Sequence, residues 1–572
     1  MVEDTALPAL TPASSAGSPD TVTRPKRKAN TATNRAKQQK RPRIEGPRPT
    51  AIDPEPEVQT EIPEIGEIDK QSTPGTPSVQ PLAHQTPRSP RPSGVTCNFI
   101  DNQFTPSKTR SWIPVHDPAT QQLITRVPES TLTDVHNAVN SAEAAQKKWR
   151  RVPLTKRRKP LLRLIELMRN NEMSLVNAIV RDVGKTADDA ISEISRSVNM
   201  VEAALSCTSV LLGYHFDNEA TETHTIDEPL GVCMAVTPFN FPLMVPMWLI
   251  PFAITTGNTI ILKPSEQAPS VITVLGELFQ QAEFPEGVFS IIHGGPAAVD
   301  KLLAEPAIKA VSFVGSDAAG QHIHSTAIAA RKRVQANCGV KNHGVVMPDA
   351  NKRQTLFALA ASCFGAAGQR CMGVSVAVFV GESNEWLSEL VEIAAQFKVG
   401  TASQQGIALG PLISRASKQK VEQMIQGAIK DGARVLLDGR GVQVPDFPDG
   451  NFIGPTIITD VQTYMECYQK EILGPVLVCM QAESLEEAIE LVNDNPYGNG
   501  CSIFTSSAKK AQMFQREVNI GRIGINVPLI ATSGQISNSS NKDSFLGDIN
   551  VHGFRGHQFF TTTKTISSIW KD

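Results

Sequence analysis

The chain has 572 residues, of which 40% are hydrophobic and 20% are charged, and its formal net charge is −2. A chain of this length and composition is expected to form a globular protein of about two to four domains. The near-zero charge gives no argument for a nucleic-acid or membrane partner, and without a run of about 18 apolar residues we expect no transmembrane helix.

Residues 1–95 differ in composition from the rest of the chain. They hold a large share of the 40 prolines, are rich in Ser and Thr and contain few large apolar residues, so we expect a disordered extension. Two basic clusters, Pro25–Lys28 and Lys37–Arg43, resemble a bipartite nuclear localisation signal. A solvated basic tail explains them about as well, and weak nucleic-acid contact is a third interpretation. Glu3 and Asp4 argue against a signal peptide and weaken a mitochondrial transit interpretation, which leaves the compartment open.

Beyond residue 95 the pattern is that of one long α/β protein. Helical periodicity covers residues 134–149 and 156–170 and, as two further helices, 174–206. Short apolar runs then alternate with helical segments, which predicts a doubly wound parallel sheet. The predicted strands are 231–236, 259–263, 288–292 and 310–314, followed by a second set near 344–347, 375–380, 433–437 and 476–480.

The nine cysteines are scattered singly and include no CxxC pair, which argues against a disulfide framework and against a metal site. One of them, Cys371, follows the small residues Gly365–Gly368 and comes directly after Arg370. Small residues allow backbone and substrate to approach closely, and the guanidinium with nearby peptide N–H groups is expected to favour a nucleophilic thiolate. A buried, inert cysteine is the alternative that this stretch alone leaves open.

Six ordered motifs surround the predicted strands and the Cys371 stretch. They are Thr237-Pro238-Phe239-Asn240-Phe241-Pro242, Lys263-Pro264-Ser265-Glu266, Phe313-Val314-Gly315-Ser316 with Gly320, Asn337-Cys338-Gly339-Val340-Lys341-Asn342, Gln369-Arg370-Cys371 and Glu471-Ile472-Leu473-Gly474-Pro475-Val476. In this order and spacing, from about residue 100 to 570, the chain resembles the aldehyde dehydrogenase superfamily. The stretches Val334–Asn337, Lys341–Asn351, Phe364–Met372 and Asn495–Gly500 resemble its CoA-acylating methylmalonate-semialdehyde dehydrogenase branch.

The resemblance implies an aldehyde dehydrogenase-like α/β fold with a Rossmann-type cofactor domain, an α/β catalytic domain and a β oligomerisation arm. We expect the NAD-binding domain at 96–335 with an oligomerisation hairpin near 215–229, the catalytic domain at 336–535 and the C-terminal arm at 536–572. The tail Gln558–Thr563 alternates as a pairing strand would, consistent with a homo-oligomer, a dimer or a tetramer.

The resemblance also implies NAD as the cofactor, bound where the parallel strands end. The residues assigned to NAD are Thr237, Phe239, Lys263, Glu266, Gln267, Ser316 and Glu471. Lys263 and Glu266 would hold the adenosine ribose, and Glu471 the nicotinamide ribose. Amides at the helix start at Ser316 could hold the pyrophosphate, although no GxGxxG fingerprint is present. Leu473 stands where the related enzymes usually have Phe.

By the same resemblance, Cys371 attacks an aldehyde, and the side chain of Asn240 forms an oxyanion hole with the backbone N–H of Cys371. Asn337 stands where hydrolytic relatives carry a glutamate that activates water. Because an amide cannot take up a proton near neutral pH, a thioester on Cys371 is expected to await another thiol, which supports CoA as the acyl acceptor.

Recognition of a substrate carboxylate suits arginine, whose fork matches two carboxylate oxygens. The resemblance assigns this role to Arg196 and Arg370, and a surface or inter-subunit salt bridge is the alternative for Arg196. We expect His293 and His343 to be structural. The segment Leu529–Ser540 departs from the branch, because it is small and polar where proline and phenylalanine are expected to line the substrate mouth.

The sequence therefore predicts NAD-dependent oxidation of a carboxylated semialdehyde, methylmalonate or malonate semialdehyde, to an acyl-CoA with loss of CO2. Its partners would be the small aldehyde, CoA and further copies of the chain, with no membrane and no nucleic acid. The alternative is a protein of the same fold with altered substrate or impaired catalysis that acts as a nuclear or regulatory binding protein. A non-acylating aldehyde dehydrogenase is a third interpretation, disfavoured by Asn337.

Overall fold

The structure is a computed structural model that describes residues 94–206, 213–217, 221–529, 534, 536–537, 539–550 and 553–570. These residues lie in one compact unit, Val79–Asp572. Almost all of the extension that the sequence predicts to be disordered, and half of the divergent segment 529–540, fall outside the described residues. None of the described helices is both long and apolar enough to cross a membrane.

The first sheet has eight strands in the order β2-β1-β9-β8-β7-β10-β11-β21. Their bounds are β1 (Asn98–Ile100), β2 (Gln103–Thr105), β7 (Val232–Val236), β8 (Thr259–Lys263), β9 (Phe289–Ile291), β10 (Ile308–Val314), β11 (Arg333–Asn337) and β21 (Phe545–Leu546). The five central strands β9 to β11 run parallel, and β1, β2 and β21 join the edges antiparallel. The four strands predicted for this sheet are present, and the parallel arrangement is confirmed.

Helices cover both faces of this sheet because successive side chains of a strand point to opposite faces. In β7, Val232 and Met234 pack into a core with α1 (Leu132–Trp149), α7 (Pro296–Ala304) and α8 (Asp317–Ala329). Cys233 and Ala235 pack into the opposite core. The helices of that second core are α2 (Leu154–Asn170), α3 (Glu172–Val183), α4 (Ala187–Ser206), α5 (Met244–Thr255) and α6 (Pro269–Gln281).

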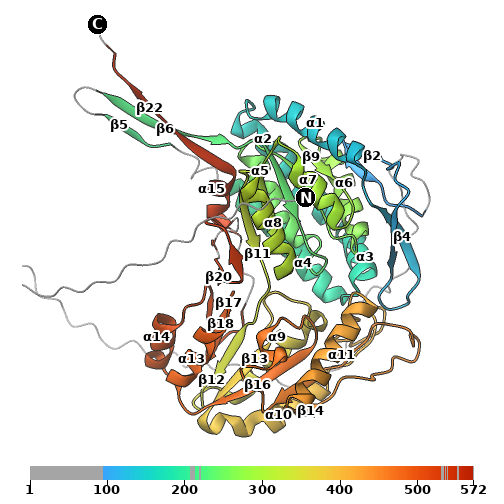
Figure 1. The fold of residues 1–572 in the computed structure, drawn as a ribbon, viewed down its shortest axis with the longest axis vertical. Helices are drawn as coiled ribbons and strands as arrows, with labels where there is room; N and C mark the ends of the chain where they lie inside the picture. The colour runs from blue at the N-terminus through green and yellow to red at the C-terminus, as the bar shows by residue number, and fades with distance from the viewer. Residues whose placement is uncertain are drawn as a thin grey trace, which may run out of the picture. The chain divides into compact units, whose positions relative to one another are not determined.

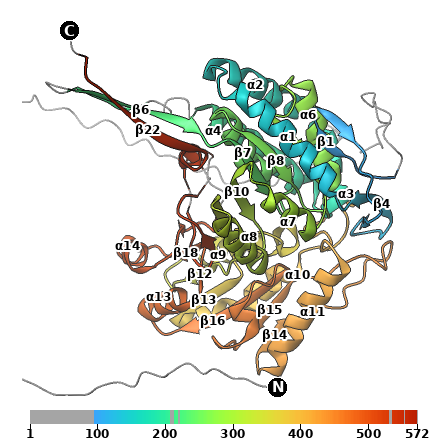
Figure 2. The ribbon, with the colours of Figure 1, turned by 45° about the horizontal axis from the view of Figure 1, so that its top comes forward.

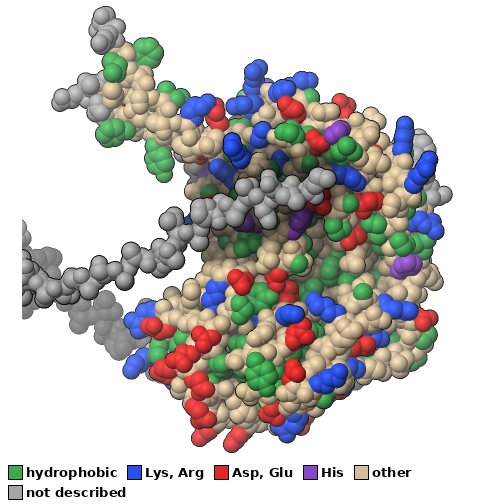
Figure 3. All heavy atoms as spheres, viewed as in Figure 1, with side chains coloured by type: hydrophobic (Ala, Val, Ile, Leu, Met, Phe, Trp, Pro, Cys, Tyr) green, Lys and Arg blue, Asp and Glu red, His purple; other side chains and the backbone are tan. Residues whose placement is uncertain are grey.

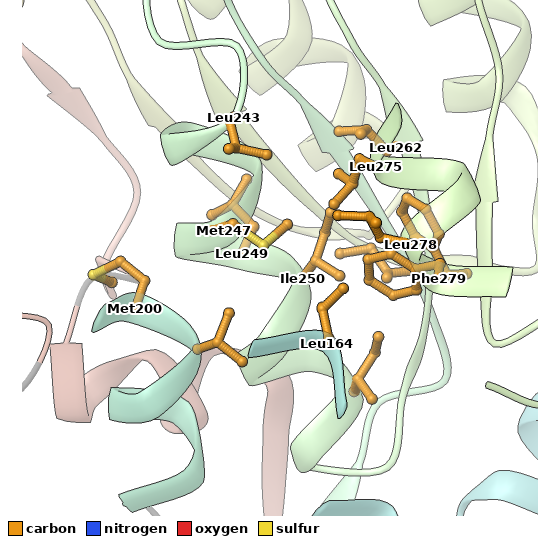
Figure 4. Close-up of a cluster of buried hydrophobic side chains, with 14 of the residues drawn as sticks. Leu164, Met200, Leu243, Met247, Leu249, Ile250, Leu262, Leu275, Leu278 and Phe279 are labelled. Atoms are coloured by element: carbon orange, nitrogen blue, oxygen red, sulfur yellow. The ribbon is translucent and has the colours of Figure 1, made fainter. Parts of the chain in front are cut away.

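Helix α5 is the buried centre of that second core. Eleven of its twelve residues are buried, so it has no polar face, and Pro251 lies inside it. Figure 4 shows Met247 and Ile250 of α5 beside Leu164 of α2, Leu262 of β8 and Phe279 of α6. This packing fixes the loop between β7 and α5, which carries Asn240, against the sheet.

The second sheet has seven strands in the order β14-β15-β16-β13-β12-β18-β19. Their bounds are β12 (His343–Val346), β13 (Val376–Val380), β14 (Arg434–Leu437), β15 (Thr456–Thr459), β16 (Val476–Ala482), β18 (Cys501–Phe504) and β19 (Ile523–Ile525). All pairs are parallel except β14 with β15. The helices around it are α9 (Lys352–Phe364), α10 (Leu387–Ala395), α11 (Arg415–Lys430), α12 (Glu466–Gln469), α13 (Leu485–Asp494) and α14 (Ala508–Glu517). The four strands predicted for this half of the chain are confirmed.

Three short strands form an arm that extends away from both sheets (Figures 1 and 2). They are β5 (His215–Asp217), β6 (Glu222–Pro229) and β22 (Thr561–Ser568), in the order β22-β6-β5. The tail strand begins three residues later than the sequence pattern suggests, because Gln558–Phe560 belong to helix α15 (Gly556–Phe560), whose two phenylalanines are buried. The hairpin β3 (Trp112–His116) with β4 (Leu123–Pro128) and the pair β17 (Tyr497–Gly498) with β20 (Asn541–Lys542) complete the unit.

Candidate active site

A cavity of about 480 Å³ lies where the parallel strands of the first sheet end. Its lining comes from the loops after β7, β8 and β10, from Cys338 after β11, and from Cys371 and Glu471 of the second half of the chain. The predicted residues that line it are Thr237, Phe239, Asn240, Lys263, Glu266, Gln267, Ser316, Cys371 and Glu471. The fold thus brings together every residue that the sequence assigned to NAD, with the candidate nucleophile and the candidate oxyanion donor. Arg196 and Arg370 are not part of this lining.

The polar groups of the cavity fit a dinucleotide. The hydroxyl of Thr237 is buried without a hydrogen-bond partner in the described structure, so a ligand in the cavity could satisfy it. Lys263 Nζ lies 3.3 Å from Glu266 Oε2, which places a donor and an acceptor side by side for ribose hydroxyls. Ser316 lines the cavity as the N-cap of α8 and makes no side-chain cap bond, so the first amides of that helix are left for a ligand to satisfy.

Asp317, the first residue of α8, leaves this anion site free. Its carboxylate accepts hydrogen bonds from the backbone N–H of Gly339 at 2.5 Å and from the hydroxyl of Tyr497 at 2.6 Å. The negative charge is therefore directed at the loop after β11 and at β17. The hydrogen bond from Gly339 ties α8, the helix that would hold the pyrophosphate, to the loop that contains Cys338.

Glu471 is partly buried beside the nucleophile, and contacts of its own loop hold it in place. Burial and the neighbouring Asp317 raise its pKa to about 7, against the opposing effect of Lys341. Lys341 Nζ donates to the backbone oxygens of Cys467 at 2.5 Å and Lys470 at 2.8 Å, so it anchors the segment that precedes Glu471. The sequence motif contained Lys341, but nothing in the sequence pointed to this anchoring role.

The loop before Cys371 has an unusual backbone. Ala366 and Ala367 have left-handed φ angles of 52° and 53°, and Gly368 has a φ of 70°. For residues with a Cβ, this conformation costs about 1–2 kcal/mol each. A Cβ on Gly368 would lie 2.1 Å from the carbonyl oxygen of Gly474. The nucleophile loop and the Glu471 loop therefore touch backbone to backbone, which explains why a run of small residues precedes the cysteine.

Two asparagines hold the carbonyl group of Cys371. Asn342 Nδ2 donates to the Cys371 oxygen at 2.9 Å, and Asn499 Nδ2 donates to the same oxygen at 3.0 Å and to Asn342 Oδ1 at 2.9 Å. Sequence reasoning missed both roles. Each asparagine lies inside a stretch that resembles the acylating branch, but the residue type alone did not distinguish a loop anchor from an ordinary turn residue.

Asn240 is buried and lies over the nucleophile loop. Its Nδ2 donates to the backbone oxygen of Gln369 at 3.1 Å, which leaves a second N–H on the same amide. Glu193 of α4 supports this loop, because its Oε1 accepts from the amides of Leu243 and Met244 at the start of α5. Its Oε2 lies 2.6 Å from Lys185 Nζ, a second contact that the sequence did not indicate.

The surroundings of the Cys371 thiol differ from the sequence-based expectation. Burial raises the pKa of Cys371 above its ordinary value, and the cations that oppose this increase are Arg522 and Lys185. Arg370, expected to favour the thiolate, instead forms an ion pair with Asp189 of α4. The expectation of a thiolate favoured by the adjacent guanidinium is therefore wrong, because the guanidinium of Arg370 is paired with Asp189.

Two further predicted residues, Arg196 and Asn337, do not line the cavity. Arg196 is exposed on α4. Asn199 and Met200, one turn further along the same helix, lie next to Gly534 of the divergent segment. Asn337 ends β11, donates to Gln335 Oε1 at 2.9 Å and accepts from Asn550 at 3.2 Å. Among the described residues that line the cavity, the carboxylates are Glu266 and Glu471.

The two histidines considered in the sequence are both buried. Burial lowers the pKa of His293 and of His343 to about 3, so each is neutral at physiological pH. His343 lies 3.3 Å from the hydroxyl of Tyr468, edge-on to its ring. Neither histidine lines the cavity, as expected for structural residues.

Comparisons with known proteins agree with this geometry. The aldehyde dehydrogenase family model matches residues 104–566. The chain is 45% identical over 479 residues to the acylating methylmalonate-semialdehyde/malonate-semialdehyde dehydrogenase of Bos taurus, which covers 83% of this chain and 89% of that protein. It is 46% identical over 477 residues to the acylating methylmalonate-semialdehyde dehydrogenase of Arabidopsis thaliana, which covers 83% of this chain and 79% of that protein. A solved methylmalonate-semialdehyde dehydrogenase from Sinorhizobium meliloti, complexed with NAD, matches with a TM-score of 0.82 at 35% identity over 83% of this chain and 98% of that one. The cavity, the buried loops and these similarities lead to one conclusion: the chain belongs to the aldehyde dehydrogenase family.

Proposed function

We propose that this protein catalyses the NAD-dependent, CoA-acylating oxidation of methylmalonate or malonate semialdehyde. The observation that carries the proposal is the convergence of Cys371, Asn240 and seven candidate cofactor residues on one cavity. The acylating relatives at 45% and 46% identity support the choice of reaction, and the relative complexed with NAD supports the cofactor. CoA is the co-substrate that an acylating reaction requires.

In this mechanism the sulfur of Cys371 adds to the aldehyde carbon and forms a C–S bond. The free N–H of the Asn240 amide and the backbone N–H of Cys371 donate to the oxygen that becomes negative. NAD, when bound, accepts the hydride that leaves the same carbon, which makes the acyl group a thioester of Cys371. The bond between the α carbon and the substrate carboxylate breaks, CO2 leaves, and the α carbon takes up a proton from water. The thiolate of CoA takes the acyl group and returns the cysteine sulfur.

The residue at position 337 favours transfer to CoA over hydrolysis. An asparagine cannot accept the proton of an attacking water near neutral pH. Both polar ends of Asn337 are already hydrogen-bonded, to Gln335 and Asn550. Of the carboxylates that line the cavity, Glu266 is paired with Lys263, and Glu471 is assigned to the nicotinamide ribose.

The test mixes purified protein with NAD, CoA and methylmalonate semialdehyde and follows the absorbance of the reduced cofactor and the mass of the acyl-CoA. We expect reduction that requires CoA for sustained turnover and disappears in Cys371→Ala. Free acid formed at the same rate without CoA would contradict the acylating step. Binding of NAD without any Cys371-dependent turnover would instead favour a binding protein on this fold.

We also propose that the arm joins copies of this chain. Large apolar side chains are exposed on it, including Tyr214 at 83%, Phe216 at 65% and Trp570 at 84% of their surface (Figure 3). Its two outer strands, β5 and β22, each leave one edge without a partner in the described structure. Light scattering should give a mass of at least two chains, and removal of residues 561–572 should reduce it.

A further inference from the structure

Three cationic side chains lie around the loop that carries Cys371: Lys185, Arg370 and Arg522. Lys185 and Arg522 both act electrostatically on the Cys371 sulfur, and Arg370 is its neighbour in the chain. A carboxylated substrate bound at Cys371 needs a positive charge close to the nucleophile. Which of the three is free to provide it can be decided from their partners.

Two of the three cations are already neutralised by the protein. Lys185 Nζ lies 2.6 Å from Glu193 Oε2, and both side chains are almost completely buried. Arg370 forms an ion pair with Asp189. A substrate carboxylate would have to compete with a carboxylate that is already in place at either position.

Arg522 has no such partner in the described part of the chain. Its Nε is buried and makes no hydrogen bond there, and no described carboxylate lies within ion-pair distance of its guanidinium. The segment that follows, residues 529–540, contains no Asp or Glu that could pair with it. Burial lowers the pKa of Arg522, and the proximity of Cys371 opposes this decrease. A partly buried cation whose Nε is fully enclosed and without a counter-ion is costly, which points to a ligand that supplies the negative charge.

The position of Arg522 matches the place of such a ligand. Its Nη1 lies 2.8 Å from the sulfur of Met372, the residue directly after the nucleophile. Its backbone is fixed at the start of β19, where its carbonyl oxygen accepts from the amide of Cys501 at 2.9 Å. Asn499 Nδ2, which donates to the Cys371 carbonyl oxygen, also lies 3.7 Å from the Met372 sulfur. We call Met372, Asn499 and Arg522 the arginine side of Cys371, because none of them lines the cofactor cavity.

We propose that Arg522 is a specificity-determining residue that binds the carboxylate of the semialdehyde substrate. The inference rests on the proposed function, because it assumes an aldehyde that carries a carboxylate. A single carbon separates that carboxylate from the aldehyde carbon that bonds to Cys371. The carboxylate must therefore lie next to the nucleophile loop. A guanidinium provides the two parallel N–H groups that bind a carboxylate in this setting.

The first experiment compares Arg522→Gln and Arg522→Lys with the wild type on methylmalonate semialdehyde and on propanal, which lacks the carboxylate. We expect Arg522→Gln to lower the ratio of kcat/KM for the two aldehydes by about 10- to 100-fold, mainly through KM of the carboxylated one. Arg522→Lys retains the charge without the fork and should lose less. Arg434→Gln, which changes an exposed arginine paired with Asp460 in the second sheet, is the matched control.

An unchanged ratio in Arg522→Gln would overturn the proposal, as would an equal loss for both aldehydes, which would indicate a structural role. A loss of the ratio in Arg370→Gln but not in Arg522→Gln would transfer the role to Arg370. If the glutamine variant does not fold, the lysine variant gives the same comparison.

A second experiment needs no turnover and separates this proposal from the proposed function. Malonate, an unreactive dicarboxylate, should slow the alkylation of Cys371 by iodoacetamide in the wild type and lose most of this protection in Arg522→Gln. Protection without any dehydrogenase activity would support the carboxylate site and contradict the proposed reaction. Turnover together with equal malonate protection in the wild type and in Arg522→Gln would support the proposed reaction and contradict the carboxylate site.

Discussion

The two sides of Cys371 are built in different ways. On the cofactor side, polar residues follow three neighbouring parallel strands, β7, β8 and β10, and meet in one cavity, so their positions are set by the sheet itself. On the arginine side, Arg522, Asn499 and Met372 come from three separate loops and meet only through the packing of the second sheet. The cofactor side therefore divides the contacts with one ligand among residues of several strands, whereas the arginine side places a single cationic side chain, Arg522, next to the nucleophile loop.

The largest effect should come from Cys371 itself, because it belongs to both sides. Cys371→Ala should lower kcat by about 10⁴-fold or more, since no other group can form the covalent intermediate. Stopped-flow measurement of the reduced cofactor gives the rate, and calorimetry should show that NAD still binds. Cys479→Ala, a buried cysteine of the second-sheet core, is the control, and comparable loss there would contradict the assignment.

Asn240 tests whether the oxyanion is stabilised from the cofactor side. Asn240→Ala should lower kcat about 10²- to 10³-fold for carboxylated and neutral aldehydes alike, because the amide donates to an oxygen that both share. Steady-state kinetics with both aldehydes measures this. A loss confined to the carboxylated aldehyde would place Asn240 with the arginine side instead.

Gly368 tests the contact between the nucleophile loop and the Glu471 loop. Gly368→Ala should destabilise the protein by about 2–4 kcal/mol, because it combines a left-handed backbone with an overlap against the Gly474 oxygen. Denaturant titration gives the difference. Gly427→Ala is the matched control: it lies inside α11 with nothing within 4 Å of the new Cβ, and should stabilise by up to about 1 kcal/mol.

The smallest effect is expected from the ionisation of Glu471. Since burial raises its pKa to about 7, the carboxyl group is largely protonated below that pH and ionised above it. An ionised carboxylate accepts ribose hydroxyls more strongly by about 1 kcal/mol, so NAD affinity should rise about fivefold as pH increases through 7. Calorimetric titration across that range should show the rise in the wild type and its absence in Glu471→Gln. A rise that persists in the variant would assign the titration to another group.

The same contrast explains how much could be predicted from the sequence. Strand ends such as Lys263 and Ser316 are local features, so the alternation of strands and helices already placed them beside one another. The ion pair of Arg370 with Asp189 joins residues 181 positions apart, and no local pattern encodes it. Arg522 escaped notice for the same reason, because an arginine at the start of a short strand looks like surface charge until its burial is known. Asn342 and Asn499 were recognised as motif members, but their shared bond to the Cys371 carbonyl depends on the second sheet.

The strand β22 has a consequence for biosynthesis. Its eight residues pair with Glu222–Pro229, more than 300 positions earlier in the chain. A ribosome that has made both sheets has therefore not yet released Thr561–Ser568, so the edge of β6 that pairs with β22 stays open until those residues emerge. A chain that stops before residue 561 would contain both sheets and an unpaired edge on β6. Quality-control proteases and chaperones would be expected to bind that form.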